Sequence, residues 1–439
     1  MIKKIAFAAL ALSLTASASY AKTQITWWHA MGGENGKKLE EIVANYNKSQ
    51  DNYEVIPTYK GSYPETMTAA IAAFRAKQQP DIVQVFEVGT ATMMAAKGAV
   101  YPVYKLMADT GTEFDPKGFI SAVVGYYTDT DGNMLSMPFN SSTPVLYYNK
   151  DVFKKAGLDP ETPPKTWEDM EAYSKKIMES GAAKCGFTTG WISWVQLENF
   201  SAWHNLQIGT NQNGFGSVDS QLTFNGPTQA RHWANLKKWQ DEGLFQYGGP
   251  VGGDDAPPKF YSQECAMYMN SSAARAAVVN NAKDFEVGVG MLPYYSDVKG
   301  APQNSIIGGA TLWVLQGHDQ EEYKGVADFF HYLSSPEVQS DWHQFSGYLP
   351  ITQAAYDYTK KQGFYDKNPG AEVALKQITL NPPTENSKGL RFGNYVQVRT
   401  IIDEEFEALL SGQKDAQAAL DSVVERGNKL IADFAAANQ

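Results

Sequence analysis

From residue 24 onward, short apolar runs typical of β-strands alternate with amphipathic helical segments, and this alternation restricts the fold more than any other feature. Such runs and helical patterns make up the first part of the chain, at residues 25–28, 35–48, 53–58, 65–77 and 81–87. This order predicts a largely parallel sheet with helices on both faces. Ligands of such sheets bind at the carboxyl ends of the strands, and Tyr63 and Glu87 both come just after a strand.

Residues 137–150, MPFNSSTPVLYYNK, join a run of small hydroxyl side chains to a β-branched and aromatic strand. The pattern of the first third stops here and a new series of helices and strands begins. We interpret this stretch as the first crossing between two lobes, with further crossings at 286–293 and 346–351. A crossing that lines a cleft is a natural binding site, since both lobes close on it. Ser142 lies within it.

The chain is long enough for two lobes. About 418 of the 439 residues remain once 21 are set aside at the start, which is more than one hydrophobic core usually serves. We therefore predict an α/β fold with two lobes, a cleft and several interlobe crossings. The N-terminal lobe takes residues 22–138 and 288–345, and the C-terminal lobe takes 139–287 and 346–439.

Residues 1–21 have the layout of a secretory signal, with Lys3 and Lys4, an apolar core and a small-residue exit that ends at Ala21. The apolar run is too short to span a bilayer comfortably. We expect cleavage after Ala21 and an exported, soluble protein.

The net charge argues against one class of partner. Once Lys3 and Lys4 are removed, 35 of the 37 basic residues remain beside 48 acidic residues, which gives a formal net charge of −13. A nucleic-acid-binding protein would need a basic face, so we do not expect nucleic acid as a partner. A small anionic ligand stays compatible, because a few N–H donors and one arginine outweigh distant carboxylates locally.

The chain has two cysteines, Cys185 and Cys265. An oxidising compartment permits a disulfide, but their separation in sequence gives no geometric support for one. Both states are open, and we expect two buried free thiols.

Three tryptophans, Trp191, Trp194 and Trp203, cluster within thirteen positions. We assign Trp203 to the core. Glycine and serine neighbours place Trp191 and Trp194 on a turn at the end of a strand, where their rings could enclose a ligand. Such rings offer apolar area and a hydrogen-bonding tip at little entropic cost.

Two further positions have the local chemistry of a binding site. Ser271 stands where a strand gives way to an alanine-rich helix, so that it either caps the helix or contributes to an anion site. Gly308 and Gly309 let the backbone approach a ligand closely.

Motifs of catalysis are missing. The chain has no Gly-x-Ser-x-Gly elbow, His-Glu-x-x-His pair, Walker A loop or dinucleotide fingerprint. The six histidines never fall at metal spacing, and DTDGN at 129–133 reads as a hairpin turn and not as a calcium loop. We expect no metal, no cofactor and no enzyme activity, and the pattern favours a carrier.

The residues also carry a resemblance to a known family. The stretches TYKGSY, QVFEVGTATMMA, PFNSSTPVLYYNKDVFKKAGLDP, WVQLENFSAW, IIGGATLWV, GYLPIT and GLRFGN begin at residues 58, 84, 138, 194, 306, 347 and 389. Over nearly its whole length after residue 21, the chain resembles the periplasmic sn-glycerol-3-phosphate-binding branch of the extracellular solute-binding proteins, which include the maltose-binding type. The resemblance implies the two-lobed periplasmic-binding-protein fold.

The resemblance further implies a monomeric component of an ATP-binding cassette (ABC) importer. Such a protein captures sn-glycerol 3-phosphate, or glycerophosphodiesters such as glycerophosphocholine, and delivers them to the inner-membrane permease. Position by position, it implies nine ligand contacts: Tyr63, Glu87, Ser142, Trp191, Trp194, Ser271, Gly309, Tyr348 and Arg399. The hydroxyls, the glycine N–H and a two-pronged Arg399 would bind the phosphate, Glu87 a glycerol hydroxyl, and the tryptophans the carbon chain. Only the resemblance selects Arg399, which otherwise reads as a solvated helix residue.

Two other functions are weighed against this one. A maltose-type sugar binder would use more aromatic platforms and carboxylates, and has less need of the serine, glycine and arginine set. A secreted phosphodiester hydrolase would need metal ligands or a nucleophile, and metal-dependent turnover would reveal it.

Overall fold

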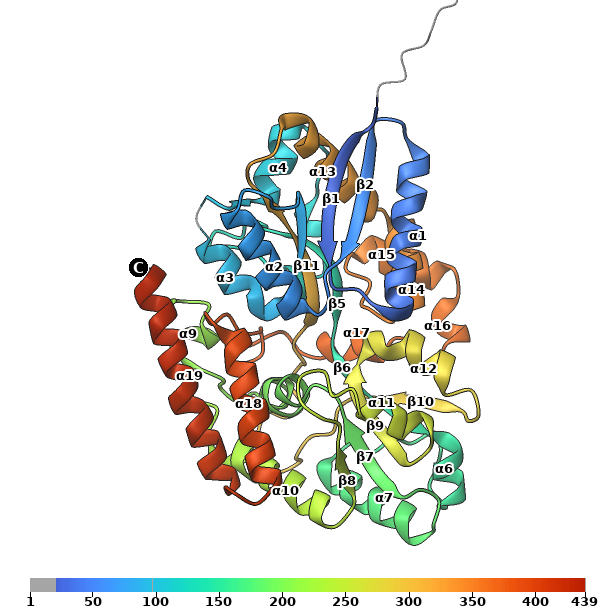
Figure 1. The fold of residues 1–439 in the computed structure, drawn as a ribbon. Coiled ribbons are helices and arrows are strands. Elements are labelled where there is room, and N and C mark those ends of the chain that lie inside the picture. The colour runs from blue at the N-terminus through green and yellow to red at the C-terminus, as the bar shows by residue number, and fades with distance from the viewer. Residues whose placement is uncertain (1–20, 97, 439) are drawn as a thin grey trace, which may run out of the picture.

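The structure is a computed structural model that describes residues 21–96 and 98–438. All of the predicted signal sequence except Ala21 therefore lies outside the described residues. Two sheets, one in each lobe, make up the β-structure (Figure 1). In the described part of the chain, no helix is both long and apolar enough to cross a membrane.

The first sheet has the strand order β2-β1-β3-β11-β4, with β5 paired to β11. Its strands are β1 (Thr23–His29), β2 (Tyr53–Tyr59), β3 (Ile82–Phe86), β4 (Val100–Tyr101), β5 (Met137–Ser142) and β11 (Gly308–Leu315). The predicted parallel pairing holds for β2, β1 and β3. Strand β11 comes from a remote part of the chain and runs antiparallel to β3, β4 and β5.

The second sheet has the order β10-β6-β9-β7-β8. Its strands are β6 (Pro144–Asn149), β7 (Cys185–Thr189), β8 (Phe245–Tyr247), β9 (Cys265–Ser271) and β10 (Val287–Gly290). Strands β7, β8 and β9 are parallel, whereas β6 is antiparallel to both β9 and β10. Only Thr143 separates β5 of the first sheet from β6 of the second, so the chain passes between the sheets inside the stretch 137–150.

The predicted return crossing at 286–293 is wrong in position. Residues 287–290 form β10, which pairs with β6 in the second sheet, and the chain joins the first sheet only at Gly308. The boundary predicted at residue 288 therefore cuts through a strand of the second sheet. The alternating sequence EVGVG predicts a strand but not the sheet that accepts it, because pairing depends on residues remote in sequence.

Helices cover both sheets (Figure 1). The first group, before β6, is α1 (Gly33–Ser49), α2 (Tyr63–Arg75), η1 (Glu87–Gly89), α3 (Thr90–Ala95), α4 (Val103–Thr110), η2 (Pro116–Gly118) and α5 (Ser121–Val124). The second, up to β10, is α6 (Lys150–Lys155), α7 (Trp167–Glu179), η3 (Trp194–Asn199), α8 (Phe200–Trp203), α9 (Thr210–Asn213), α10 (Pro227–Asp241), α11 (Ala256–Tyr261), η4 (Ser272–Ala274) and α12 (Arg275–Asn281). The last is α13 (Gln320–Leu333), α14 (Pro336–Ser346), α15 (Gln353–Lys361), α16 (Phe364–Lys367), α17 (Val373–Ile378), α18 (Tyr395–Leu410) and α19 (Ala416–Asn438).

Local chemistry explains where the helices nearest the cleft begin. Helix α2 starts with a capping box, in which the Ser62 side chain caps the backbone at Glu65 and the Glu65 carboxylate accepts from Ser62 N. Tyr63 is thereby held at the first position of the helix, directly after the loop from β2. Helices α18 and α19 pack against each other along the second lobe, and α18 also reaches η1 of the first.

The expectation of two free cysteines is wrong. Cys185 and Cys265 form a disulfide, with their Cα atoms 4.4 Å apart. They begin the adjacent parallel strands β7 and β9 and stand directly opposite each other in the register. Their separation of 80 residues gives no sign of this proximity, because register is a tertiary property.

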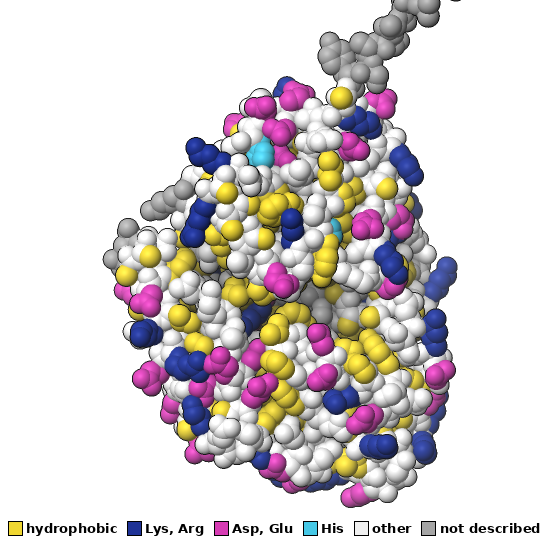
Figure 2. All heavy atoms as spheres, in the orientation of Figure 1, with side chains coloured by type: hydrophobic (Ala, Val, Ile, Leu, Met, Phe, Trp, Pro, Cys, Tyr) yellow, Lys and Arg dark blue, Asp and Glu magenta, His cyan; other side chains and the backbone are white. Residues whose placement is uncertain are grey.

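The predicted hairpin at 129–133 is present. Thr128 and Met134 form an antiparallel bridge, and the Asp129 carboxylate accepts hydrogen bonds from the backbone N–H groups of Asp131 and Asn133. Trp203 is 1% exposed, as expected for a core residue. On the face shown in Figure 2, acidic and basic side chains are interspersed.

Candidate functional site

All nine predicted ligand contacts line one cavity of about 240 Å³ between the two sheets. The residues are separated by up to 336 positions in sequence, from Tyr63 to Arg399, and they come from both lobes. Five further residues line the same cavity: Asn35, Asn270, Ala273, Ala274 and Gly308. None of the five is among the nine predicted contacts, although Gly308 was singled out together with Gly309 and Asn270 adjoins Ser271.

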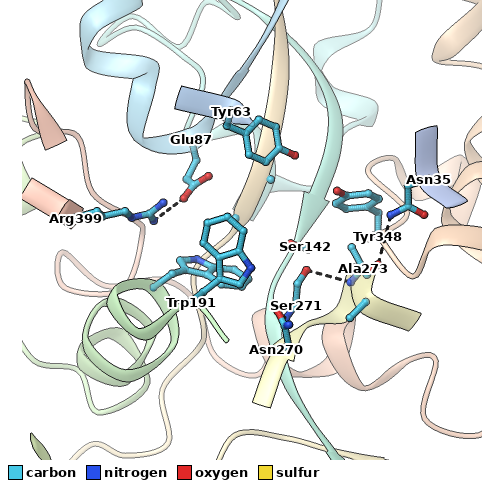
Figure 3. A pocket seen from close by; sticks show the side chains of 14 residues that line it. Asn35, Tyr63, Glu87, Ser142, Trp191, Asn270, Ser271, Ala273, Tyr348 and Arg399 are labelled. Carbon is cyan, nitrogen blue, oxygen red and sulfur yellow. Dashed lines mark hydrogen bonds and ion pairs between the residues drawn. The ribbon is translucent and has the colours of Figure 1, made fainter. Parts of the chain in front are cut away.

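Figure 3 shows that the cavity has two chemically different sides. Glu87 and Arg399 point toward each other on one side, while Ser271, Ser142 and Tyr348 lie on the other. Trp191 lies between them. This separation follows from the fold, because η1, directly after β3, and α18 supply the charged pair, whereas β5, β9 and the segment after α14 supply the hydroxyls.

Arg399 is 8% exposed, although it belongs to a helix that looked solvated in sequence. Its Nε and Nη2 atoms donate to the two carboxylate oxygens of Glu198, at 2.8 and 2.6 Å. Nη2 also donates to Glu87 Oε1 at 2.6 Å. The guanidinium edge that was expected to make a bidentate contact with a phosphate is therefore bound to Glu198. Of the three guanidinium nitrogens, Nη1 alone makes no hydrogen bond to a described residue.

The two carboxylates keep the Arg399 guanidinium charged. Burial lowers the pKa of Arg399, but the carboxylates of Glu198 and Glu87 outweigh it, so that the pKa lies well above its usual value. Burial raises the pKa of Glu87, and the Arg399 charge opposes the rise. One cation faces two carboxylates, so the ionised cluster carries a net negative charge. Glu198 lies in η3 and was not selected from the sequence.

The hydroxyl side consists of neutral donors. Ser142 ends β5, and its hydroxyl has no hydrogen-bond partner within residues 21–96 and 98–438. Ser271 Oγ accepts from Ala273 N at 3.1 Å, which leaves its proton free to be donated. The N-cap role considered for Ser271 and its place in the cavity thus coexist.

Two tyrosines complete this side. Burial raises the pKa values of Tyr63 and Tyr348, so both phenols stay protonated. Tyr63 Oη accepts from Asn140 Nδ2 at 2.9 Å, and Asn140 is held in turn by Gln84. The phenol proton of Tyr63 is consequently available to another acceptor.

The predicted turn holds for one tryptophan only. Trp191 follows β7 in the left-handed region, at φ 48°, and packs beside Gly252 of a neighbouring loop. Trp194, by contrast, begins the π-helical segment η3, is 4% exposed and donates from Nε1 to Ile307 O at 3.4 Å. Trp191 is therefore a partly exposed wall of the cavity and Trp194 a buried one.

The double glycine is required by two close approaches. A Cβ atom on Gly308 would collide with the Trp194 ring, and one on Gly309 would collide with the carbonyl oxygen of Asn140. Gly309 also has φ 97°, which side chains rarely adopt. The absence of side chains at Gly308 and Gly309 therefore allows β11 to begin in the narrow space between β5 and the Trp194 ring.

Comparison with known proteins identifies relatives of high similarity. The profile of the family described as bacterial extracellular solute-binding proteins matches residues 41–373. The sn-glycerol-3-phosphate-binding periplasmic protein of Salmonella typhimurium is 51% identical over 432 residues, which cover 98% of this chain and 97% of the relative. The same-named protein of Escherichia coli is 52% identical over 427 residues, 97% of this chain and 96% of its own.

Solved structures share the fold at lower identity. UgpB from Mycobacterium tuberculosis, solved in complex with glycerophosphocholine, superposes with a TM-score of 0.75 at 20% identity, over 94% of this chain and 99% of that one. The GacH receptor of Streptomyces glaucescens, solved unliganded and with acarbose, gives a TM-score of 0.76 at 17% identity, with the same coverage. These likenesses establish the two-lobed fold predicted from the sequence.

Proposed function

The chain belongs to the bacterial extracellular solute-binding protein family, and we propose that it captures sn-glycerol 3-phosphate in the cavity between its lobes and delivers it to an ABC importer. Glycerophosphodiesters such as glycerophosphocholine are the second ligand class. The names of the relatives from Salmonella typhimurium and Escherichia coli support the first ligand. The Mycobacterium tuberculosis protein, whose structure holds glycerophosphocholine, supports the second.

The observation that carries the proposal is the separation of neutral donors from the charged pair. The phosphate belongs with the hydroxyls of Ser142, Ser271 and Tyr348 and the N–H of Gly309, where no carboxylate lines the cavity. Several hydrogen bonds from preorganised neutral donors stabilise an anion in a site of low dielectric constant. At the opposite side, the negative Glu87–Arg399–Glu198 cluster would repel it.

The glycerol hydroxyls then face Glu87 and Arg399. Glu87 has accepting capacity beyond the bond from Arg399, and Arg399 Nη1 is an unused donor, so that together they offer a hydroxyl both an acceptor and a donor. This orientation differs from the one implied by the resemblance, in which Arg399 holds the phosphate. Trp191 and Trp194 cover the carbon chain between the two ends.

The remaining parts of the proposal follow from the family. The protein works in the periplasm as a monomer, its first 21 residues are removed on export, and its partners are the ligand and the inner-membrane permease subunits. It performs no chemistry on the ligand. Groups from both lobes line the cavity, so ligand binding favours the closed form and the ligand shifts the population toward it.

Titration calorimetry on the mature chain, refolded from denaturant to remove carried-over ligand, tests the proposal. Glycerol 3-phosphate, glycerophosphocholine and maltose are titrated in parallel. We expect one-to-one binding of a glycerophosphate ligand with a Kd in the micromolar range or tighter and no heat from maltose. Heat from maltose alone, or silence from both phosphorylated ligands, would refute it. Ser142→Ala provides the second arm, since it removes one phosphate donor and should weaken glycerol 3-phosphate at least as much as the diester.

A further inference from the structure

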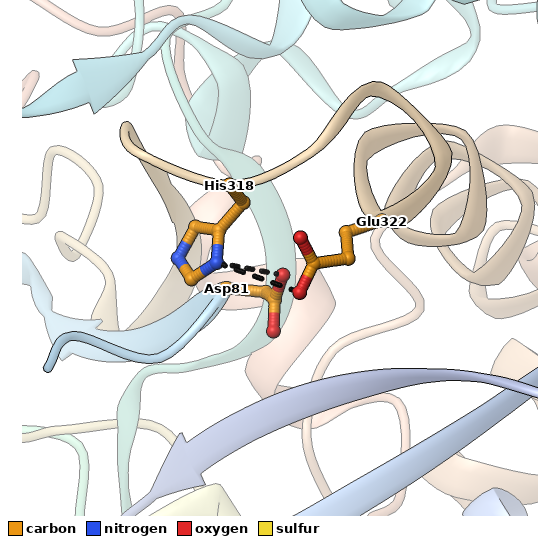
Figure 4. Close-up of side chains that lie close together, drawn as sticks. All are labelled: Asp81, His318 and Glu322. Atoms are coloured by element: carbon orange, nitrogen blue, oxygen red, sulfur yellow. Dashed lines mark ion pairs between the residues drawn. The ribbon is translucent and has the colours of Figure 1, made fainter.

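A cluster of three ionisable side chains lies outside the cavity, at the opposite end of β3 from Glu87. Figure 4 shows how Asp81, His318 and Glu322 converge. Asp81 immediately precedes β3, His318 lies in the loop after β11, and Glu322 is in the first turn of α13. One atom of each converges with the others: Nδ1 of His318 is 3.3 Å from Asp81 Oδ1 and 3.8 Å from Glu322 Oε1. All three atoms lie within 4.8 Å of one another.

The hydrogen bond on the far side of the imidazole fixes its tautomer. His318 Nε2 lies 3.1 Å from the carbonyl oxygen of Pro80, which can only accept, so Nε2 carries a proton. In the neutral ring, Nδ1 then presents a lone pair. That lone pair faces two carboxylate oxygens, which are acceptors as well. Three converging acceptors require a positive charge among them.

The remaining oxygens of the two carboxylates are already occupied. Asp81 Oδ2 accepts from Thr26 N and Thr26 Oγ1, both at 2.7 Å. Glu322 Oε2 accepts from Asp319 N at 2.6 Å, as part of the capping box of α13. Each residue is thus held by a second partner with a single atom left facing the centre.

Asp81 supplies an independent sign of a missing ligand. The residue is 1% exposed, and its Oδ1 atom is buried without a hydrogen-bond partner in the described part of the chain. A buried carboxylate oxygen left in this state is costly. Oδ1 is also the atom aimed at His318.

We propose that Asp81, His318 and Glu322 form a binding site for a divalent transition-metal cation, with Zn²⁺ as the best fit. Donors bound to Zn²⁺ at about 2.0–2.2 Å stand about 3.3–3.6 Å apart in a tetrahedron. The distance between His318 Nδ1 and Asp81 Oδ1 fits this range, and the partly exposed Glu322 closes the remainder by a small side-chain movement. Water takes the fourth position.

The partners behind the ligands match a metal site. Metal-bound histidines usually donate their other ring N–H to a backbone carbonyl or carboxylate, as His318 does to Pro80. Two carboxylates balance the charge of a divalent ion, and the imidazole disfavours Ca²⁺ and Mg²⁺. The metal would fasten the start of β3 to the start of α13 and would leave the ligand cavity untouched.

The test is calorimetric titration of Zn²⁺ into the tag-free mature chain after treatment with a chelator, together with thermal unfolding. We expect one Zn²⁺ per chain, a rise of a few degrees in the unfolding midpoint, and weaker binding of Ca²⁺ and Mg²⁺. Binding of no Zn²⁺ would overturn the proposal, and the central charge would then be a second proton on His318.

Two variants assign the binding to this cluster. His318→Gln should lose Zn²⁺ affinity by about tenfold or more, while His331→Gln, which removes an exposed histidine elsewhere on α13, should bind as the parent does. Glu322→Gln removes the carboxylate but can retain the capping box, so it reports on the metal if His318→Gln folds poorly. Unchanged Zn²⁺ affinity in both His318→Gln and Glu322→Gln would also refute the site.

Discussion

Arg399 Nη2 and Glu87 Oε1 are 2.6 Å apart, and this ion pair joins the two lobes across the cavity. Glu87 follows β3 of the first sheet, and Arg399 belongs to α18, which packs along the second lobe. A second link, from Asn35 Nδ2 to Ala273 O at 3.4 Å, crosses between the lobes on the other side of the cavity. The lobes are therefore connected by the same residues that line the proposed binding site.

Glu87→Gln should weaken both the interlobe link and the ligand complex. Glutamine retains an acceptor for Arg399 but loses the charge, so the charge-assisted bond becomes an ordinary one. We expect affinity for glycerol 3-phosphate to fall by about tenfold or more, and small-angle scattering to give a larger radius of gyration for the ligand-free variant. Asn35→Ala is the comparison, because it removes only the weaker link. Equal radii and affinities in Glu87→Gln and the parent would contradict the assignment.

Arg399→Ala should harm folding as well as binding. Removing the guanidinium leaves Glu87 and Glu198 buried together without a cation, a change that typically costs about 3–5 kcal/mol of stability. We expect more than a tenfold loss of ligand affinity, or over about 1.4 kcal/mol. Denaturant unfolding measures the first effect and calorimetry the second. Arg399→Lys separates the effect on folding from the effect on binding, since it keeps the charge but cannot bond to both Glu198 oxygens in one plane. Ligand affinity within tenfold of the parent in both variants would show that Arg399 does not contact the ligand.

The two adjacent glycines should respond differently to alanine. Gly308→Ala pushes against the Trp194 ring, so it should displace one cavity wall and reduce ligand affinity with a smaller effect on folding. Gly309→Ala meets the Asn140 carbonyl at φ 97°, so it should destabilise the fold by about 2 kcal/mol or more. Thermal unfolding and calorimetry measure the two effects. Gly118→Ala, where only ordinary contact with Asp115 is created, is the matched control and should change neither.

The strands β2, β3 and β5, which precede or contain cavity residues, could be predicted because hydrophobic periodicity is a local property of the sequence. Glu87 and Ser142 were placed at a strand end and a crossing, and the structure puts them there, whereas Tyr63 begins α2 after a short loop from β2. Arg399 was not predictable from periodicity, since a helix face looks solvated until the segments that cover it are known. Glu198 was not predicted because its partner Arg399 is remote in sequence. The cluster of Asp81, His318 and Glu322 was not predicted because Asp81 is remote from the other two residues.

The disulfide between Cys185 and Cys265 should stabilise the second lobe without affecting ligand binding. Closing a loop of this length is worth about 2–5 kcal/mol. The cysteines begin β7 and β9, whereas Trp191 and Ser271 lie at the other ends of these strands, roughly 15–20 Å away. Reduction, or the double variant Cys185→Ala/Cys265→Ala, should lower the unfolding midpoint and leave affinity within about twofold. Two reactive thiols in the denatured, unreduced chain would contradict the pairing.

His204 should make the protein less stable as the pH falls below about 6.5. Its Nδ1 lies 2.7 Å from Phe200 O and its Nε2 accepts from Tyr295 N at 2.9 Å, so a second proton would break the bond from Tyr295. Burial lowers the pKa of His204 to about 4. Between about pH 6.5 and 4 the unfolded chain binds more protons at this residue than the folded chain does. Neutral His204 therefore contributes about 3 kcal/mol to the free energy of unfolding above pH 6.5, and this contribution is lost as the pH falls toward 4. Denaturant unfolding from pH 7.5 to 4.5 should show this decline, and His204→Gln should reduce it while lowering stability at pH 7.5. His331→Gln, at an exposed position, is the control and should leave the slope of unfolding free energy against pH unchanged. An equal slope in His204→Gln and the parent would show that His204 does not contribute to the loss of stability at low pH.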